Sequence, residues 1–448
     1  MQGDYIVMHR FMTIFICAVI ISTLTGCREN KNETSSVSKT ENSGTTTISF
    51  WTFPVFNQDS PTDSDGTYEQ KLIDEFEKEH SNIKVELNLV DFSSGDDKIK
   101  TARKNKENCD ILLDAPGRII SYAKNGYLIP LNEFFDSNIT YDISNSNVLN
   151  ACKSEDDYYM YPISSAPFYM AFNKAYLEDA GILDIVKEGW TVDDFTKVTK
   201  ALFEKGYISG SVFCKNTTGD QGTRAFAANL FSGNITDSSL SSYSTDSDKM
   251  VKAFEYIQNA VKKGYLTNGK EDTSADAISK FVSGRCSFTL LWSQNLETSN
   301  IGQLRRNNVE TVSVPYPSDD GKAELEYLIN GFCIFDNGDQ DRIRASKEFL
   351  KFITDKSREK DIVIHTNCIP VKNSLKKIYK DPQMNEISHW QDYYGVYYNN
   401  IDGFPEMRKQ WINTLLNLLD HENTPRQCAD FFTKQANLTI KENYKDSK

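Results

Sequence analysis

The sequence predicts an α/β protein of two lobes, each assembled from two separate stretches of chain and joined by three extended crossings. Its 448 residues favour two or three domains over one. Short apolar runs typical of strands alternate with stretches of helical periodicity, which is the pattern of an α/β fold. Three extended segments that carry proline lie near 160–168, 311–317 and 366–371, and proline cannot continue a helix. The predicted lobes comprise residues 46–163 with 315–366 (N-terminal) and residues 164–314 with 367–448 (C-terminal).

Residues 1–26 predict a signal peptide rather than a part of the fold. Their apolar run, Phe11 to Leu24, is too short to cross a bilayer as a helix, and it ends in the residues LTGC at 24–27. That ending resembles the lipobox of bacterial lipoproteins, which implies cleavage before Cys27 and lipidation of the Cys27 sulfur. An ordinary secretory signal with an incidental cysteine is the alternative. Residues 27–45 are poor in apolar side chains and predict a flexible tether.

The first part of the predicted fold alternates strands and helices. Residues 46–53, TTISFWTF, predict a strand because they are rich in β-branched and aromatic residues. The loop at 54–66 contains DSDG but lacks the other ligands of a calcium loop. A helix face follows at 68–76, alternating apolar residues at 83–89 predict a strand, and the charged stretch to Lys106 predicts an exposed helix.

Residues 109–131, CDILLDAPGRIISYAKNGYLIPL, predict a buried strand, a turn and a helix that ends at Gly126. In open α/β sheets, ligands bind beyond the carboxyl ends of the strands. Asp114 and Arg118 lie at that end of the predicted strand, so both are candidate ligand-binding residues. The alternative roles are a turn residue and a surface charge.

The segment 158–173, YYMYPISSAPFYMAFN, predicts the first crossing because its two prolines keep it extended. Beyond it, Thr191 predicts the N-cap of a helix that ends at Gly206, and Pro425 predicts the first turn of the last helix. We also predict helices over 250–263 and 342–354, a turn that leads into a buried strand over 281–292, and a strand over 328–335 that is broken at Asn330 and Gly331.

Composition excludes several classes of function. A net charge of −13 argues against nucleic-acid binding, which needs a basic surface. The cysteines beyond Cys27 lack the spacing of a zinc or redox site, so we predict mostly reduced core thiols and leave one disulfide open. The histidines form no pair at metal-binding spacing, and no nucleophile elbow or phosphate-binding loop occurs. We therefore predict no metal, no cofactor and no catalytic residue.

Several stretches, in order along the chain, resemble the family 1 extracellular solute-binding proteins of ABC importers. They are ISFWTF, CDILLDAPGRIISYAKNGYLIPLNEF, YPISSAPFYMAFNKAYLEDAGI followed by WTVDDF, SGRCSFTLLW, SVPYP with LINGFCIF, ASKEFLKFIT and NCIPVKNS. The resemblance covers nearly the whole chain after the tether. It implies a type II periplasmic-binding-protein-like fold, in which two lobes close about a hinge over a ligand, and its members mostly bind sugars or oligosaccharides.

The resemblance also implies ligand-binding residues. Trp51 and Phe53 end the first strand, where relatives contact ligand, and Arg118 aligns with a sugar-contacting arginine of the maltose-binding branch. Asp114 stands where that branch has an aromatic residue, and Ala166 replaces one of its acidic contacts, which weakens the case for a maltodextrin ligand. The remaining candidates are aromatic rings and a small polar turn: Phe168, Tyr169, Trp292, Asn330, Gly331, Trp390 and Tyr394. A place in the core is the alternative for each ring.

We therefore expect a solute-binding lipoprotein of an ABC importer, anchored through Cys27 on the outer face of the cytoplasmic membrane of a Gram-positive bacterium. It is expected to capture a carbohydrate as a monomer and to deliver it to the permease. One alternative is a lipid-anchored enzyme that degrades glycans, but the sequence contains no catalytic constellation that supports it. The other alternative is a surface sugar sensor or adhesin without transport, and the family resemblance favours transport.

Overall fold

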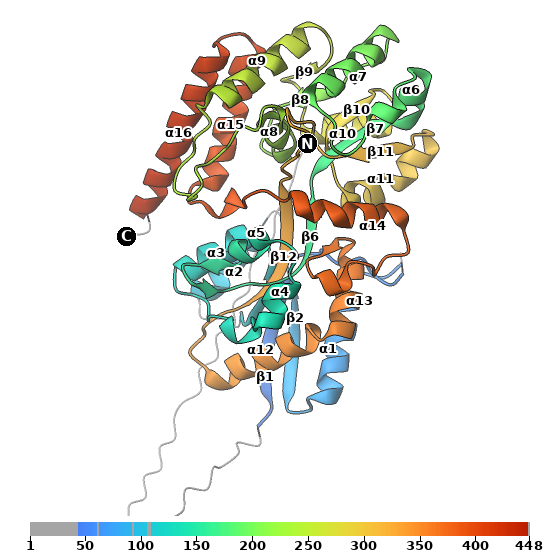
Figure 1. Cartoon of the computed structure of the whole chain (residues 1–448). Coiled ribbons are helices and arrows are strands. Elements are labelled where there is room, and N and C mark those ends of the chain that lie inside the picture. The colour runs from blue at the N-terminus through green and yellow to red at the C-terminus, as the bar shows by residue number, and fades with distance from the viewer. Residues whose placement is uncertain (1–43, 61, 92–93, 105–108, 447–448) are drawn as a thin grey trace, which may run out of the picture. The chain divides into compact units, whose positions relative to one another are not determined.

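The computed structural model describes residues 44–60, 62–91, 94–104 and 109–446 (Figure 1). The expected signal peptide, most of the expected tether and the candidate lipidation site Cys27 lie outside these residues. Strands and helices alternate over much of the described chain, which ends in a series of helices after β13. Within the described ranges, no helix is both long enough and apolar enough to cross a membrane.

A six-stranded sheet forms the first part of the fold. In spatial order its strands are β13 (Ile369–Pro370), β6 (Tyr161–Pro167), β12 (Tyr327–Ile334), β3 (Ile111–Asp114), β1 (Thr46–Thr52) and β2 (Ile83–Leu89). β1 runs parallel to β2 and β3, whereas β12 runs antiparallel to β3 and β6. Because β1 and β3 are parallel, their carboxyl ends, near Phe53 and Asp114, lie at the same edge of the sheet.

Helices cover this sheet through the predicted apolar faces. α1 (Thr67–Glu79) packs on β2 and α12 (Gln340–Ile353) packs on β1. Phe76 of α1 is fully buried, and its ring meets Phe349 of α12 edge to face at 5.0 Å. The other helices of this part are α2 (Gly95–Lys104), α3 (Pro116–Lys124), η1 (Asn132–Phe134), α4 (Ser137–Asp142), α5 (Ser146–Ala151) and α13 (Lys356–Thr366), with the short strands β4 (Lys153–Ser154) and β5 (Asp157–Tyr158).

A three-stranded antiparallel sheet forms the second part, in the order β10 (Phe288–Trp292), β7 (Tyr169–Asn173) and β11 (Thr311–Val314). The strands β8 (Ser211–Phe213) and β9 (Thr267–Gly269) pair with each other in parallel and form no pair with this sheet. The helices of this part are α6 (Lys174–Asp179), η2 (Leu183–Ile185), α7 (Val192–Glu204), α8 (Gln221–Leu230), α9 (Asp248–Lys262), α10 (Ser274–Val282) and α11 (Gln294–Arg306). The chain ends in η3 (Asn373–Leu375), α14 (Pro382–His389), η4 (Trp390–Tyr393), η5 (Tyr398–Asn400), α15 (Phe404–Leu419) and α16 (Pro425–Asp446).

The first predicted crossing, 158–173, is extended as expected. It forms β6 in the larger sheet and then β7 in the smaller one (Figure 1). β12 and β13 pair with β6 on its two sides. The expected crossing at 311–317 differs, because residues 311–314 form β11 and pair with β7 inside the smaller sheet. The strand beside β6 is instead β12, which continues past Asn330 and Gly331 through a β-bulge. A Cβ at Gly331 would lie 2.4 Å from the carbonyl oxygen of Tyr161, so this close pairing requires glycine.

Local signals in the sequence locate several elements correctly. Thr191 and Asp194 form the expected capping box at α7, and Gly126 adopts φ 70° after the end of α3.

The seven cysteines among the described residues are all free and buried, which confirms the predicted reduced core thiols.

Candidate ligand-binding cavity

A cavity of about 930 Å³ opens at the edge where β1 and β3 end. Its wall includes α3 with the residue before it, Phe168 after β6, and the first residues of α8. Asp96 and Lys100 of α2, residues 326–328 at the start of β12, and most residues from 397 to 408, through η5 into α15, complete the wall. The cavity therefore collects side chains from segments that are far apart in the sequence.

Arg118 is the predicted site residue that contributes most clearly to this wall. Its side chain is 40% exposed, and its Nε donates to Asp114 Oδ2 at 2.6 Å. The guanidinium also lies over the ring of Phe53, at 4.7 Å from the ring centroid. Burial raises the pKa of Asp114, and its bonds to Arg118 oppose that rise. Asp114 and Phe53 thus lie behind Arg118 and hold its guanidinium beside the cavity.

Aromatic rings supply apolar surface to the wall. Phe168 is 8% exposed and lines the cavity, and its backbone N–H donates to the carbonyl of Glu326 at 2.9 Å. Tyr327 also lines the cavity and stacks on Tyr394 with 3.9 Å between ring centroids. Tyr397 and Phe404 add two further rings. Rings beside hydrogen-bonding groups form the kind of surface that binds the apolar faces and hydroxyls of small polar ligands.

A buried cluster of charges forms the part of the wall between α8 and α15. Arg224 on α8 is paired with Asp220 one turn earlier and, through Nη2, with Glu326 Oε2 at 2.8 Å. Asp220 also accepts from Arg408 Nε at 2.8 Å. Tyr398 accepts from Arg224 Nε at 2.6 Å and donates to Glu326 Oε1. Burial raises the pKa of Glu326, and Arg224 opposes that rise.

α3 and η5 approach each other beside the cavity. Lys124 Nζ donates to Asp402 Oδ1 at 2.8 Å and to the carbonyl of Asn400 at 3.0 Å. A Cβ at Gly117 would lie 3.3 Å from the carbonyl oxygen of Asn399. The two helical segments that border the cavity are therefore tied by direct contacts.

The other predicted site residues lie away from the cavity. Tyr169 and Trp390 are buried and meet edge to face at 4.9 Å, and Trp292 is buried with its Nε1 donating to Glu297 at 2.7 Å. Trp51 is partly buried and donates to Ser49 Oγ at 3.1 Å. Asn330 and Gly331 belong to the bulge in β12, where Asn330 donates to Ser164 Oγ at 3.2 Å and Gly331 pairs with Asp114. Tyr394 lies behind Tyr327, with its hydroxyl 2.9 Å from Ser165 Oγ.

Sequence reasoning does not identify Arg224, Glu326, Tyr398 or Arg408 as site residues. They meet only because α8, the start of β12, η5 and α15 converge in the fold. The one local signal is Arg224 within TRAFAANL, a charged residue in an otherwise apolar helical stretch, where charged side chains are rarely buried without a partner.

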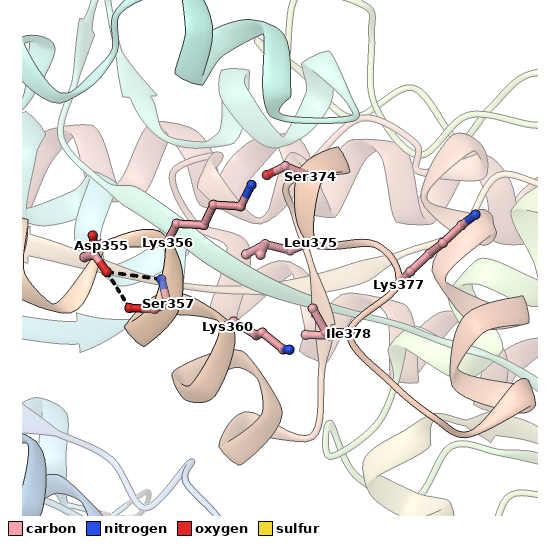
Figure 2. Close-up of a pocket in the computed structure, with 8 residues that line it drawn as sticks. All are labelled: Asp355, Lys356, Ser357, Lys360, Ser374, Leu375, Lys377 and Ile378. Carbon is pink, nitrogen blue, oxygen red and sulfur yellow. Dashed lines mark hydrogen bonds between the residues drawn. The ribbon is translucent and has the colours of Figure 1, made fainter.

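A second pocket, of about 560 Å³, lies between the first turns of α13 and η3 (Figure 2). It is lined by Lys356, Lys360 and Lys377, which are exposed, together with serine, leucine and isoleucine side chains. The three lysine side chains point in different directions, and the Asp355 carboxylate is already bonded to Ser357 (Figure 2). No aromatic ring lines this pocket, so the larger cavity is the better candidate site. No cluster suited to a metal ion occurs in the part of the chain that the structure describes.

Comparisons with known proteins agree with the geometry. A model of the family described as bacterial extracellular solute-binding protein matches residues 71–387, more than two thirds of the chain. No curated protein sequence matches significantly.

Many solved structures are similar to the chain. The GacH receptor of Streptomyces glaucescens, solved unliganded and with acarbose, is 18% identical with a TM-score of 0.67, over 89% of this chain and 99% of that one. The substrate-binding protein Lmo0181 of Listeria monocytogenes, solved with cycloalternan, is 18% identical with a TM-score of 0.65, over 89% and 99%. The sugar-binding protein MalE of Xanthomonas citri is 13% identical with a TM-score of 0.70, over 90% and 99%.

Proposed function

Because the chain belongs to the family of bacterial extracellular solute-binding proteins, we propose that it captures a carbohydrate in the 930 Å³ cavity and delivers it to the permease of an ABC importer. Its fold is the two-lobe, type II periplasmic-binding-protein-like fold of the similar structures. The observation that carries the proposal is the wall of the cavity, where the rings of Phe168, Tyr327 and Tyr397 stand beside Arg118 and Glu326. The similar structures include complexes with acarbose and with cycloalternan, and a chitin oligosaccharide binding protein.

The charges around the cavity favour a neutral sugar over an acidic one. Every lysine or arginine that lines the cavity pairs with a carboxylate, so its charge is already neutralised and it attracts a ligand carboxylate or phosphate less strongly than an unpaired cation would. The pairs are Lys100 with Asp96, Arg118 with Asp114, Lys124 with Asp402, Arg224 with Asp220 and Glu326, and Arg408 with Asp220.

Capture follows from hinge closure. We propose two lobes, with α3 in one and α8 in the other, and both helices line the cavity. A ligand that contacts both lobes binds the closed state more tightly than the open one and shifts the population towards it. The closed form then docks on the permease. The protein acts as a monomer and catalyses no reaction on the captured sugar.

A binding screen tests the proposal. Purified protein is heated with maltotriose, cellotriose, xylotriose, chitotriose, raffinose and galacturonic acid, and each increase in Tm is confirmed by calorimetric titration. We expect at least one neutral sugar to raise the Tm saturably, because a ligand that binds only the folded state stabilises it. Reducing ends are assayed in the same samples. New reducing ends would show that the protein hydrolyses the sugar and would contradict a pure binding function. If no sugar changes the Tm, the proposal of a carbohydrate ligand is rejected.

We also propose that Cys27 carries a diacylglyceryl anchor, which holds the protein at the outer face of the cytoplasmic membrane. The LTGC ending of the apolar run supports this proposal. In cells grown with a radiolabelled fatty acid, Cys27→Ser should abolish label in the protein and release it from the membrane fraction. Cys109→Ser is the matched control, because Cys109 is a buried core thiol. Label that persists in Cys27→Ser would contradict the anchor.

A further inference from the structure

Arg224 is a guanidinium with 1% exposure that is held by two carboxylates and one phenol at the wall of the cavity. Arg224 belongs to a charge cluster of two cations, Arg224 and Arg408, and two anions, Asp220 and Glu326. Such a cluster is costly to bury, and apolar residues of similar volume often stabilise a core as well or better. Its position beside the cavity therefore calls for an explanation other than stability.

The hydrogen bonds of Glu326 explain why the cluster lies beside the cavity. A carboxylate oxygen has two acceptor positions. Oε1 of Glu326 accepts from both Arg224 Nε, at 3.1 Å, and the Tyr398 hydroxyl, so both of its positions are used. Oε2 accepts only from Arg224 Nη2, at 2.8 Å, among the described residues. One acceptor position of Oε2 therefore remains, on a side chain that is 14% exposed and lines the cavity.

The cluster also fixes the direction of that carboxylate. Arg224 Nη2 donates to Oε2, and the Nε–H of Arg224 is shared between Oε1 and the Tyr398 hydroxyl. Together with the hydroxyl's own bond to Oε1, these contacts leave the carboxylate little freedom to rotate. Asp220 holds Arg224 from the opposite side and is itself held by Arg408. The acceptor position of Oε2 is thus preorganised by groups from α8, η5 and α15.

We propose that Glu326 accepts a hydrogen bond from one hydroxyl of the bound sugar, and that Arg224 and Tyr398 are positioning residues that orient it. The inference rests on the proposed function, because it needs a ligand that presents a hydroxyl donor in this cavity. It makes Glu326 a determinant of specificity, since a ligand without a donor at that position would cover the carboxylate and leave one acceptor position of Oε2 unsatisfied.

Binding is measured by calorimetry with the sugar of the screen that wild type binds most tightly. Glu326→Gln and Arg224→Lys should each raise the Kd about 10- to 100-fold, as expected for loss or misplacement of one charge-assisted hydrogen bond. Tyr398→Phe removes one hydroxyl while it keeps the ring and the Arg224 pair, so it should fold and should raise the Kd by a smaller factor. Glu324→Gln, two residues from Glu326 and exposed outside the cavity, is the matched control and should bind as wild type does.

Two readouts separate a ligand contact from a structural role. The groups facing Glu326 are Arg224 and Asp220 from α8, Tyr398 from η5 and Tyr316 from the segment after β11. Protonation would turn the acceptor into a donor, so the Kd of wild type should rise as the pH falls, and this component should be absent in Glu326→Gln. The second readout is the Kd of monodeoxy analogues of the bound sugar, each of which lacks one hydroxyl. Only the analogue that lacks the hydroxyl contacting Glu326 should bind wild type and Glu326→Gln with similar affinity.

The outcomes are distinguishable. If no sugar of the screen binds wild type, the proposed function and this inference both fall. If wild type binds a sugar but Glu326→Gln and Tyr398→Phe bind it within twofold of wild type, the inference is overturned and the proposed function stands. Parallel pH profiles of wild type and Glu326→Gln would likewise overturn the inference. Arg224→Lys is interpreted only if its Tm shows a folded protein, and the other two variants decide the question without it.

Discussion

At the scale of single residues, the same kind of side chain serves different purposes according to its neighbours. The guanidinium of Arg118 is held beside the cavity by Asp114 and the ring of Phe53. The indole of Trp292 is instead fully buried at the end of β10, where it meets Phe281 edge to face at 5.2 Å. Its Nε1 donates to Glu297 at 2.7 Å, so its polar atom is also satisfied inside the protein. In this structure the indole contributes to packing.

Trp292→Ala should therefore act mainly on stability. Removing a fully buried indole loses apolar contact and leaves a cavity, which costs about 3–5 kcal/mol in the free energy of unfolding. Urea denaturation followed by circular dichroism measures this change. Trp51→Ala is the matched control, because Trp51 is only partly buried and should cost less. A stable Trp292→Ala variant that had lost its affinity for sugar would place Trp292 at the ligand instead.

At the scale of elements, the helices and strands with local signals are those that the sequence predicts well. The capping box of Thr191 and Asp194 fixes the start of α7, and the glycine after α3 fixes its end, because these signals act within a few residues. The strand that pairs with β6, in contrast, depends on contacts between segments far apart in the sequence. The sequence predicts that 311–317 and 328–335 are both extended, and only the completed sheet pairs β12 rather than β11 with β6.

The residues of the candidate site also fall into two groups, those that a local pattern identifies and those that only the fold brings together. Arg118 follows a strand end, which a general rule for α/β sheets identifies from sequence, and it lines the cavity. Tyr169 and Trp390 are aromatic residues of a kind that sugar sites use, yet composition does not tell which face of a strand or helix turns to the core. Arg224, Glu326 and Tyr398 escape prediction because each is ordinary in its own segment, and only the convergence of distant segments creates their cluster.

At the scale of the whole molecule, a second buried charge cluster ties together the segments around β6. Lys372, after β13, donates to Glu359 of α13 at 2.5 Å and to the hydroxyl of Tyr161 of β6 at 2.7 Å. Glu359 is fully buried, and burial raises its pKa from an ordinary value of 4.5 to about 7, although Lys372 opposes the rise. Because the group is held by three segments of the fold, its protonation is linked to the free energy of unfolding of the molecule.

The sign of that linkage gives a prediction. Between about pH 5 and 7, folded Glu359 holds its proton more often than unfolded Glu359 does, so its contribution to stability falls as the pH rises through this window. The free energy of unfolding of wild type minus that of Glu359→Gln, measured by urea denaturation at several pH values, should therefore decrease from pH 5 to pH 7.5. Subtracting the variant removes the other titrating groups, which both proteins share. Glu348→Gln, at a partly exposed position on α12, controls for the loss of one carboxylate from the chain. A difference for Glu359→Gln that rises with pH would mean that the pair with Lys372 outweighs burial and holds the carboxyl ionised.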